Sequence, residues 1–182
     1  MRIWVTTFVS IAAILFFAAT GASAANVAKI GVLDFQRVLD ASDAGKEAQA
    51  RINKQGKEME TDLKKKGSDI ETMRKQLERE QMVISKDARD EKEREIRIKI
   101  NDFKTLQQRY TKKARSLQLK EMGEIKKAVF KILETLGKKD GYTLIVERQE
   151  GGVLYSPETI DVTDKLIKAY NKEFAKGGEK KK

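Results

Sequence analysis

The sequence predicts an α+β fold in which a long antiparallel helical hairpin projects like a tentacle from a small β-sheet body. Residues 42–136 carry apolar side chains at helical spacing on both sides of a turn near residues 85–87. The only proline, Pro157, lies outside this stretch. Short segments rich in β-branched residues precede and follow the hairpin, so we expect residues 25–41 and 137–176 to form the body.

Residues 1–24 have the pattern of a secretory signal peptide. Arg2 supplies the positive start, an apolar run extends through Phe17, and residues 22–24 give the small-x-small cleavage pattern. We therefore expect a mature chain that starts at Ala25 and resides in a bacterial periplasm. An uncleaved membrane anchor is the alternative, although the apolar run is short for a membrane span.

The first part of the body is expected to contain a strand at residues 27–34 and a single helical turn at residues 35–39. Ser42 or Asp43 then caps the descending helix, because either side chain can accept a free backbone N–H group. The apolar residues of this helix repeat at heptad spacing, at Ile52, Met59, Leu63, Ile70, Met73, Leu77 and Ile84. This stripe predicts an intramolecular coiled coil with a thin apolar seam.

The turn between the two helices is predicted to present an apolar tip to solvent, at residues 82–84. Asp87 is expected as the N-cap of the ascending helix, where its carboxylate meets free backbone N–H groups. With the turn centred here, Gly67 lies opposite Phe103, and its missing side chain leaves room for the ring. Apolar residues of the ascending helix become denser toward the body.

The ascending helix is expected to end at Gly137, as a glycine C-cap reinforced by Lys138 and Lys139. Beyond it we expect a strand at 142–147, a turn at 149–152 and a returning strand at 153–155. A last helix is then capped by Asp161 or Thr163. Its apolar face is expected to bury Val162, Leu166, Ile167, Tyr170 and Phe174. Residues 177–182 are expected to form a disordered basic tail. Three short strands bury little apolar surface, which favours self-association.

The composition excludes several classes of function. The chain has no Cys and no His, which excludes thiol and imidazole catalysis, disulfides and Cys/His zinc sites. We predict no catalytic, cofactor-binding or metal-binding residue, and no enzymatic activity, because the adjacent pair Ser85 and Lys86 would point apart on a helix. The formal net charge of +10 favours acidic or anionic partners. Nucleic-acid binding is not expected, since no base-reading motif is present.

The order of several short motifs resembles the Skp/OmpH family of periplasmic chaperones. The matching segments are KIGVLD at 29–34, QRVL at 36–39, Ser42 with AGK at 44–46, SKDAR at 85–89, KEREI at 92–96, VLYS at 153–156 and IDVT at 160–163. The resemblance covers nearly the whole mature chain. It implies a homotrimer whose three hairpins enclose a cavity for unfolded outer-membrane proteins in transit. Lipopolysaccharide binding is also reported in the family, but no lipopolysaccharide-binding residue can be placed on this chain.

With the resemblance, these observations imply an ATP-independent periplasmic holdase that keeps unfolded outer-membrane β-barrel proteins from aggregating. The chain lacks the phosphate-binding loop motif of nucleoside triphosphatases and needs no cofactor. An exported coiled-coil scaffold is one alternative. An envelope protein that binds lipopolysaccharide or anionic lipid is another, because basic residues meet lipid phosphates favourably.

Two groups of hairpin residues are the candidates for client binding. Apolar contact is expected from Met59, Met73, Met82, Val83 and Phe103. Charge is expected from Lys64, Lys65, Lys66, Arg74 and Arg79. Packing in the seam is the alternative role for the apolar residues other than Met82 and Val83, and a solvated helix face is the alternative for the basic ones.

Overall fold

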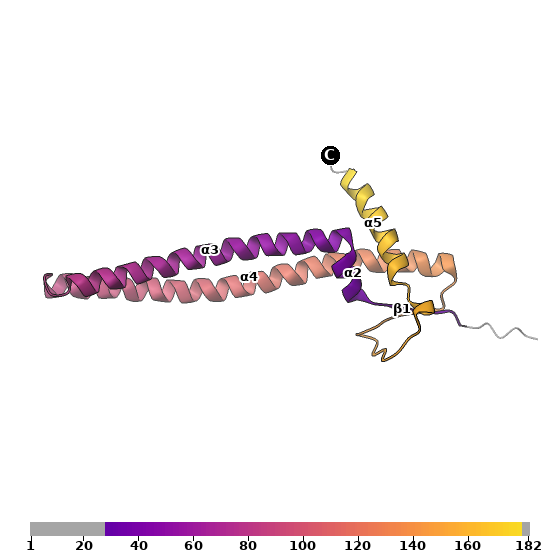
Figure 1. Ribbon diagram of the computed structural model, residues 1–182, viewed down its shortest axis with the longest axis horizontal. Helices are drawn as coiled ribbons and strands as arrows, with labels where there is room; N and C mark the ends of the chain where they lie inside the picture. The colour runs from indigo at the N-terminus through magenta and orange to yellow at the C-terminus, as the bar shows by residue number, and fades with distance from the viewer. Residues whose placement is uncertain (1–27, 180–182) are drawn as a thin grey trace, which may run out of the picture.

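The computed structural model describes residues 28–179, so the predicted signal peptide and the last three residues lie outside it. The elements are β1 (Ile30–Leu33), α2 (Phe35–Ala41), α3 (Asp43–Glu80), α4 (Lys86–Asp140), β2 (Leu144–Glu147), the 3₁₀ turn η1 (Glu158–Ile160) and α5 (Thr163–Glu179). Figure 1 shows α3 and α4 side by side as a long rod, with the remaining elements gathered at one end. The predicted α+β hairpin fold is therefore confirmed.

The two long helices differ in length, and this difference builds the body. Helix α3 has 38 residues and α4 has 55. At a rise of about 1.5 Å per residue they extend roughly 57 and 82 Å. The extra turns of α4 continue past the start of α3 and provide a surface on which α5 packs (Figure 1). Among the helices of residues 28–179, none is both long and apolar enough to cross a membrane.

The start of α3 is held close to α2 by a serine cap and a glycine. Ser42 caps α3 as predicted, because its hydroxyl accepts the N–H of Gly45 at 3.1 Å. A Cβ on Gly45 would lie 1.9 Å from the carbonyl oxygen of Leu39, the last residue but two of α2. Only glycine therefore allows the chain to reverse this tightly between the two helices.

The N-cap of α4 is Ser85, and the prediction of Asp87 is wrong. The Ser85 hydroxyl accepts the N–H of Ala88 at 3.3 Å, and the backbone of Ser85 is extended. Helix α4 therefore begins at Lys86, which moves Asp87 into the first turn. Its carboxylate there still lies near the positive end of the helix dipole.

The prediction that α4 ends at Gly137 is also wrong, because the helix continues to Asp140. The C-cap is Gly141, whose φ of 71° is the left-handed conformation that closes a helix. Gly137 remains helical, and its carbonyl oxygen accepts the N–H groups of Gly141 and Tyr142. Gly137, a glycine within the last turn, resembles a helix end in the sequence, although the C-cap lies four residues further on at Gly141.

The body sheet has two strands within the described chain, and they run parallel. β1 pairs with β2 in the register Ile30 to Leu144, and Val32 makes one further bridge to Asp161. The predicted returning strand at 153–155 is wrong, because these residues are irregular and Leu154 is fully exposed. Because β2 pairs with β1, the residues that follow β2 form an irregular loop and no β-hairpin.

The apolar core lies where α2, the ends of the hairpin helices and α5 meet. Its buried residues are Leu33, Val38, Ala44, Ala48, Ile125, Val129, Val162, Leu166 and Tyr170. Just before α5, the carboxylate of Asp161 accepts the N–H of Thr163, the first residue of the helix, at 2.8 Å. Helix α5 continues through Glu179, so residues 177–179, which were predicted to be disordered, are helical. Apolar density rises toward the body as predicted.

Candidate functional site

The far half of the hairpin has a seam that is only partly closed. On α3, no side chain beyond Met59 is buried, although the heptad stripe continues to Ile84. On α4, Ile96 is the single buried residue in the same half. The remaining seam side chains, such as Ile70 and Met73, are half-buried. This half therefore offers partly exposed apolar surface along its whole length.

A groove of about 580 Å³ opens between the helices halfway along the hairpin. Its apolar lining consists of Ile70, Met73, Phe103 and Leu106. Gly67 lies beside it, and a Cβ at this position would come within 3.9 Å of the Phe103 ring. The predicted placement of Phe103 opposite Gly67 is confirmed. We call this site the mid-hairpin groove.

Charged side chains of both signs surround the mid-hairpin groove. Its basic residues are Lys66, Lys99 and Arg109, and its acidic residues are Asp62, Asp69 and Asp102. The Tyr110 hydroxyl donates to Asp62 at 2.7 Å across the two helices, and this hydrogen bond raises the pKa of Tyr110. The mixed rim can meet polar groups of either sign beside an apolar contact.

The mid-hairpin groove brings together three of the ten predicted site residues: Lys66, Met73 and Phe103. Met59 lies nearer the body and is buried in the seam. Arg74 lines a shallower groove toward the tip, beside Leu77 and Ile96. The other three basic candidates, Lys64, Lys65 and Arg79, are exposed on α3.

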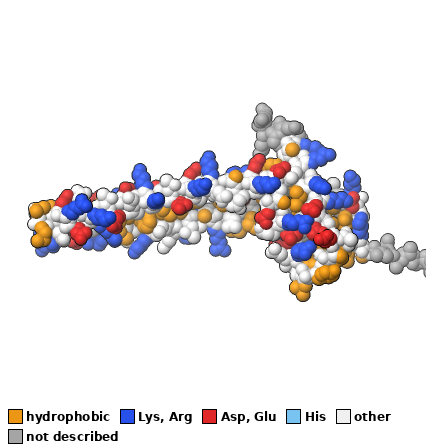
Figure 2. Space-filling view, in the orientation of Figure 1, with side chains coloured by type: hydrophobic (Ala, Val, Ile, Leu, Met, Phe, Trp, Pro, Cys, Tyr) orange, Lys and Arg blue, Asp and Glu red, His pale blue; other side chains and the backbone are white. Residues whose placement is uncertain are grey.

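The hairpin tip presents the two remaining candidates, Met82 and Val83, whose side chains are 88% and 82% exposed. The turn that carries them is held by backbone hydrogen bonds from Val83 and Ile84 to the carbonyl oxygen of Glu80. Lys92 pairs with the Glu80 carboxylate, and this contact lowers the pKa of Glu80. Figure 2 shows the resulting apolar cluster at the end of the rod. Two apolar side chains thus stand in solvent on an ordered turn.

An ion pair joins the two helices where the seam meets the body. Arg51 binds Glu121 through two contacts, Nη2 to Oε2 at 2.6 Å and Nε to Oε1 at 3.2 Å. Glu121 is only 8% exposed, and its hydrogen bond to Arg51 lowers its pKa. This pair was not predicted from the sequence. The signal was a carboxylate that interrupts the apolar stripe between Leu117 and Ile125.

A second group that the sequence analysis missed lies on the outer face of α4. Ile98, Leu119 and Phe130 are each more than half exposed. Their spacing of 21 and 11 residues keeps them within one side of the helix, away from the seam. A search for apolar residues outside the heptad stripe would have found them.

The body holds a charged cluster that stabilises its loop. Asp161 accepts hydrogen bonds from Arg37 at 3.2 Å and from Arg148 at 3.4 Å. Burial alone would raise the pKa of Asp161, but the hydrogen bonds of Thr163 and the two guanidinium charges lower it. Within the described chain, no three acidic side chains are placed to hold a metal ion.

Comparisons with known proteins agree with this architecture. Residues 29–170 match the family described as outer membrane protein (OmpH-like). No curated protein matches the chain. A crystal structure of a Caulobacter crescentus protein, provisionally described as an outer membrane chaperone (OmpH-like), superposes with a TM-score of 0.74. The two chains are 16% identical over 81% of this chain and 86% of the other, so this likeness concerns the fold.

Proposed function

This chain belongs to the OmpH-like family of outer membrane proteins, and from that premise we propose that it is an ATP-independent holdase chaperone. Its clients are unfolded outer-membrane β-barrel proteins that cross the periplasm. The observation that carries this proposal is the long hairpin whose far half leaves its apolar seam half-exposed among charged side chains. The family and the description of the Caulobacter protein both support a chaperone-type role.

The physical basis of holding is a large number of weak contacts. Strands of outer-membrane barrels alternate apolar and polar residues, so they expose apolar side chains in water before they fold. A groove lined by Met73 and Phe103 accepts such side chains, while the exposed Met82 and Val83 offer a second contact at the tip. Methionine adapts its shape to different partners. Many weak contacts also let the client leave without an energy source.

Charge provides the long-range attraction in this proposal. The chain carries a formal net charge of +10, and exposed lysines such as Lys64 and Lys65 lie on the hairpin surface. Arg74 and Arg79 extend this basic surface toward the tip. Such a surface attracts acidic clients over a distance of about 10 Å at moderate salt. Affinity for an acidic client should therefore fall as the salt concentration rises.

Self-association into a homotrimer is part of the proposal. The outer edge of β2 has no partner strand within residues 28–179, and Ile30 and Leu144, which start β1 and β2, are about half exposed. Leu154 and Tyr155 expose further apolar surface on the body loop. Copies of the chain that cover these surfaces would place several hairpins around one space. Sedimentation of the mature protein measures the number of copies.

The direct test is a light-scattering assay without ATP. An outer-membrane barrel protein unfolded in urea is diluted into buffer with and without the mature protein. We expect scattering to be suppressed at a stoichiometric amount of chaperone. Equal aggregation in both samples would end the chaperone proposal. If the protein instead binds one folded partner and no unfolded chain, the scaffold alternative is the better description.

A further inference from the structure

A second groove lies in the body, between the last turns of α4 and helix α5. It has a volume of about 660 Å³, within the range of about 300–1,000 Å³ that is usual for small-molecule sites. Its floor is apolar and is formed mainly by Ile132 and Leu136 of α4 with Tyr170 and Phe174 of α5. The two aromatic rings pack edge to face, with centroids 6.4 Å apart. The floor is therefore ordered and mostly free of polar atoms.

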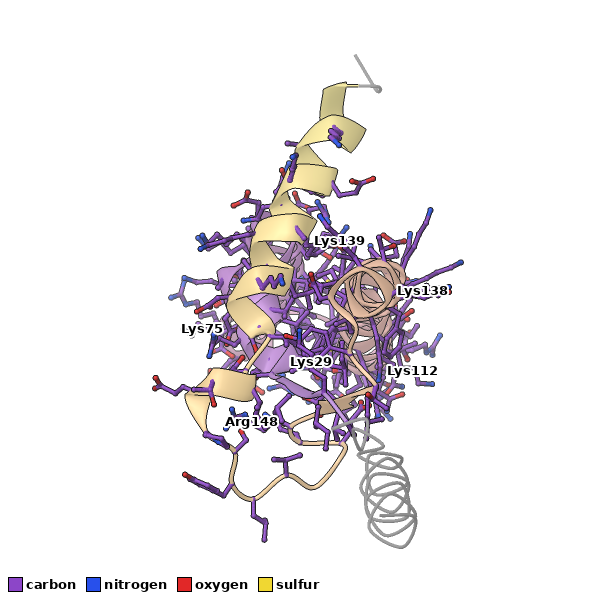
Figure 3. The ribbon with its side chains drawn as sticks, turned by 90° about the vertical axis from the view of Figure 1, so that its right-hand side faces the viewer. Lys29, Lys75, Lys112, Lys138, Lys139 and Arg148 are labelled. Atoms are coloured by element: carbon purple, nitrogen blue, oxygen red, sulfur yellow. The ribbon has the colours of Figure 1, made fainter. Side chains whose placement is uncertain are left out.

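Five lysines surround this floor, and we call the site the lysine-rimmed groove. Lys131 and Lys139 come from α4, and Lys165, Lys172 and Lys176 come from α5. Figure 3, which looks at the body end of the hairpin, shows Lys139 between the end of α4 and α5, and Lys138 on the other side of α4.

The rim carries an excess of unneutralised positive charge. Lys165 pairs with Asp140 at 2.7 Å, whereas the other four lysines make no ion pair with the described residues. Of the described residues, Asp140 and Glu173 are the only carboxylates that line the groove. An anionic group on the occupant would therefore complement the rim.

The groove walls restrict what the rest of the occupant can be. Both walls are α-helices, whose backbone N–H and C=O groups are already hydrogen-bonded within each helix. The hydroxyl of Thr135 also donates within its own helix, to the carbonyl oxygen of Lys131 at 3.1 Å. An extended peptide would therefore leave its own backbone groups unpaired against the floor, at a cost in free energy. A hydrocarbon chain has no such groups.

We propose that the lysine-rimmed groove binds a fatty acid, with its acyl chain on the apolar floor and its carboxylate at the lysine rim. Long lysine side chains suit this geometry, because their stems cover apolar surface while their ammonium groups reach the anionic head. The site lies in the body and shares no lining residue with the mid-hairpin groove. It is therefore independent of the proposed holdase function.

The test is calorimetric titration of the mature protein with laurate below its critical micelle concentration. We expect saturable binding of one laurate per chain, and much weaker binding of monolaurin, which has the same acyl chain and a neutral head. The double variant Lys139→Glu/Lys172→Glu should bind laurate at least about tenfold more weakly, because two nearby charges are reversed. Ala169→Phe, which places a ring in the groove, should abolish binding.

The matched control is Lys112→Glu/Lys138→Glu, which changes the net charge equally at positions outside the groove (Figure 3). It should weaken laurate binding less than about twofold, because exposed charges at a distance are screened by salt. Equal losses in the two double variants, or full binding by Ala169→Phe, would contradict the proposal. Equal affinity for monolaurin would also contradict it. A change in the sedimenting mass of the groove variants would instead assign the groove to contacts between copies of the chain.

Discussion

The body end and the tip end of the hairpin bury apolar side chains to very different extents. Val38, Val129 and Leu166 are completely buried where α2, α4 and α5 meet. Beyond Met59, by contrast, α3 buries no side chain, and Met82 at the tip stands in solvent. Full burial of a side chain of this size contributes about 1.5–3 kcal/mol. The body end therefore supplies most of the stability of the hairpin.

This difference in burial explains how one continuous helix pair can fold reliably and still expose apolar surface on its far half. Helices of this length need tertiary packing to be stable in water, and the core at the body provides it. The far half then extends from a fixed base with a seam that is only strong enough to keep the helices paired. In our proposal, the surface that the seam leaves exposed is what clients contact. Four predictions test this division, and each compares a body position with a hairpin position.

The largest effect should come from truncating a core leucine. Leu166→Ala should lower the free energy of unfolding by about 3 kcal/mol, because Leu166 is completely buried between α5 and the hairpin base. The matched change Leu77→Ala, at a half-buried seam position, should cost about 1 kcal/mol or less. Urea denaturation followed by circular dichroism measures both. Similar losses in the two variants would show that the far seam is as important for stability as the core.

Two glycines sharpen the comparison further. Gly45→Ala should destabilise the protein by about 2 kcal/mol, because the new Cβ would clash with the carbonyl oxygen of Leu39. Gly56→Ala meets no atom within 4 Å and should stabilise α3 by about 0.5–1 kcal/mol through helix propensity. Thermal unfolding of both variants checks the signs. A destabilised Gly56→Ala would mean that the hairpin needs flexibility at this point.

The ion pair at the hairpin base should show its contribution as a pH dependence. Arg51 lowers the pKa of Glu121 in the folded protein below its ordinary value of 4.5. The stabilisation is therefore fully present above pH 4.5 and is lost as the pH falls through the lowered pKa. Glu121→Gln should cost about 1 kcal/mol at neutral pH, and this cost should shrink as the pH falls below 4.5.

The control for this prediction is Glu134→Gln, which removes an exposed pair with Lys138 on one helix. It should cost less than Glu121→Gln at neutral pH, because an exposed pair within a helix is weak. Denaturation curves recorded at several pH values give both differences. A cost for Glu121→Gln that does not change with pH would place its effect in packing and not in charge.

The smallest effect on stability should come from the tip. The double variant Met82→Ser/Val83→Ser should leave the free energy of unfolding within about 0.5 kcal/mol of the wild type, because both side chains are exposed. Its affinity for an unfolded barrel protein should nevertheless fall by about threefold to tenfold, since apolar contacts at the tip are lost. Leu119→Ser, another exposed apolar side chain but on the outer face of α4 toward the body, is the matched control. Unchanged client affinity in the tip variant would indicate that clients bind in the grooves and not at the tip.

Much of the hairpin was predictable because its signals are local. The heptad stripe, the Ser42 cap and the pairing of Gly67 with Phe103 depend on residues within one helix or on a turn of known position. The tip is exposed as predicted, because its place follows from the position of the turn. The errors lie at chain reversals, where Ser85 and Gly141 competed with Asp87 and Gly137 for the cap positions. Neighbouring residues offered equally good caps, and the packing of the ends selected between them.

The sequence by itself determined that the molecule is a long charged hairpin whose apolar side chains are concentrated at one end. Side-chain spacing along a helix decides this without reference to the rest of the chain. Only the tertiary structure decided that β1 and β2 pair in parallel, that Arg51 meets Glu121, and that α4 and α5 enclose a lysine-rimmed groove. These contacts join segments far apart in the sequence. Their existence depends on which surfaces meet after the chain has folded, and no local pattern encodes that choice.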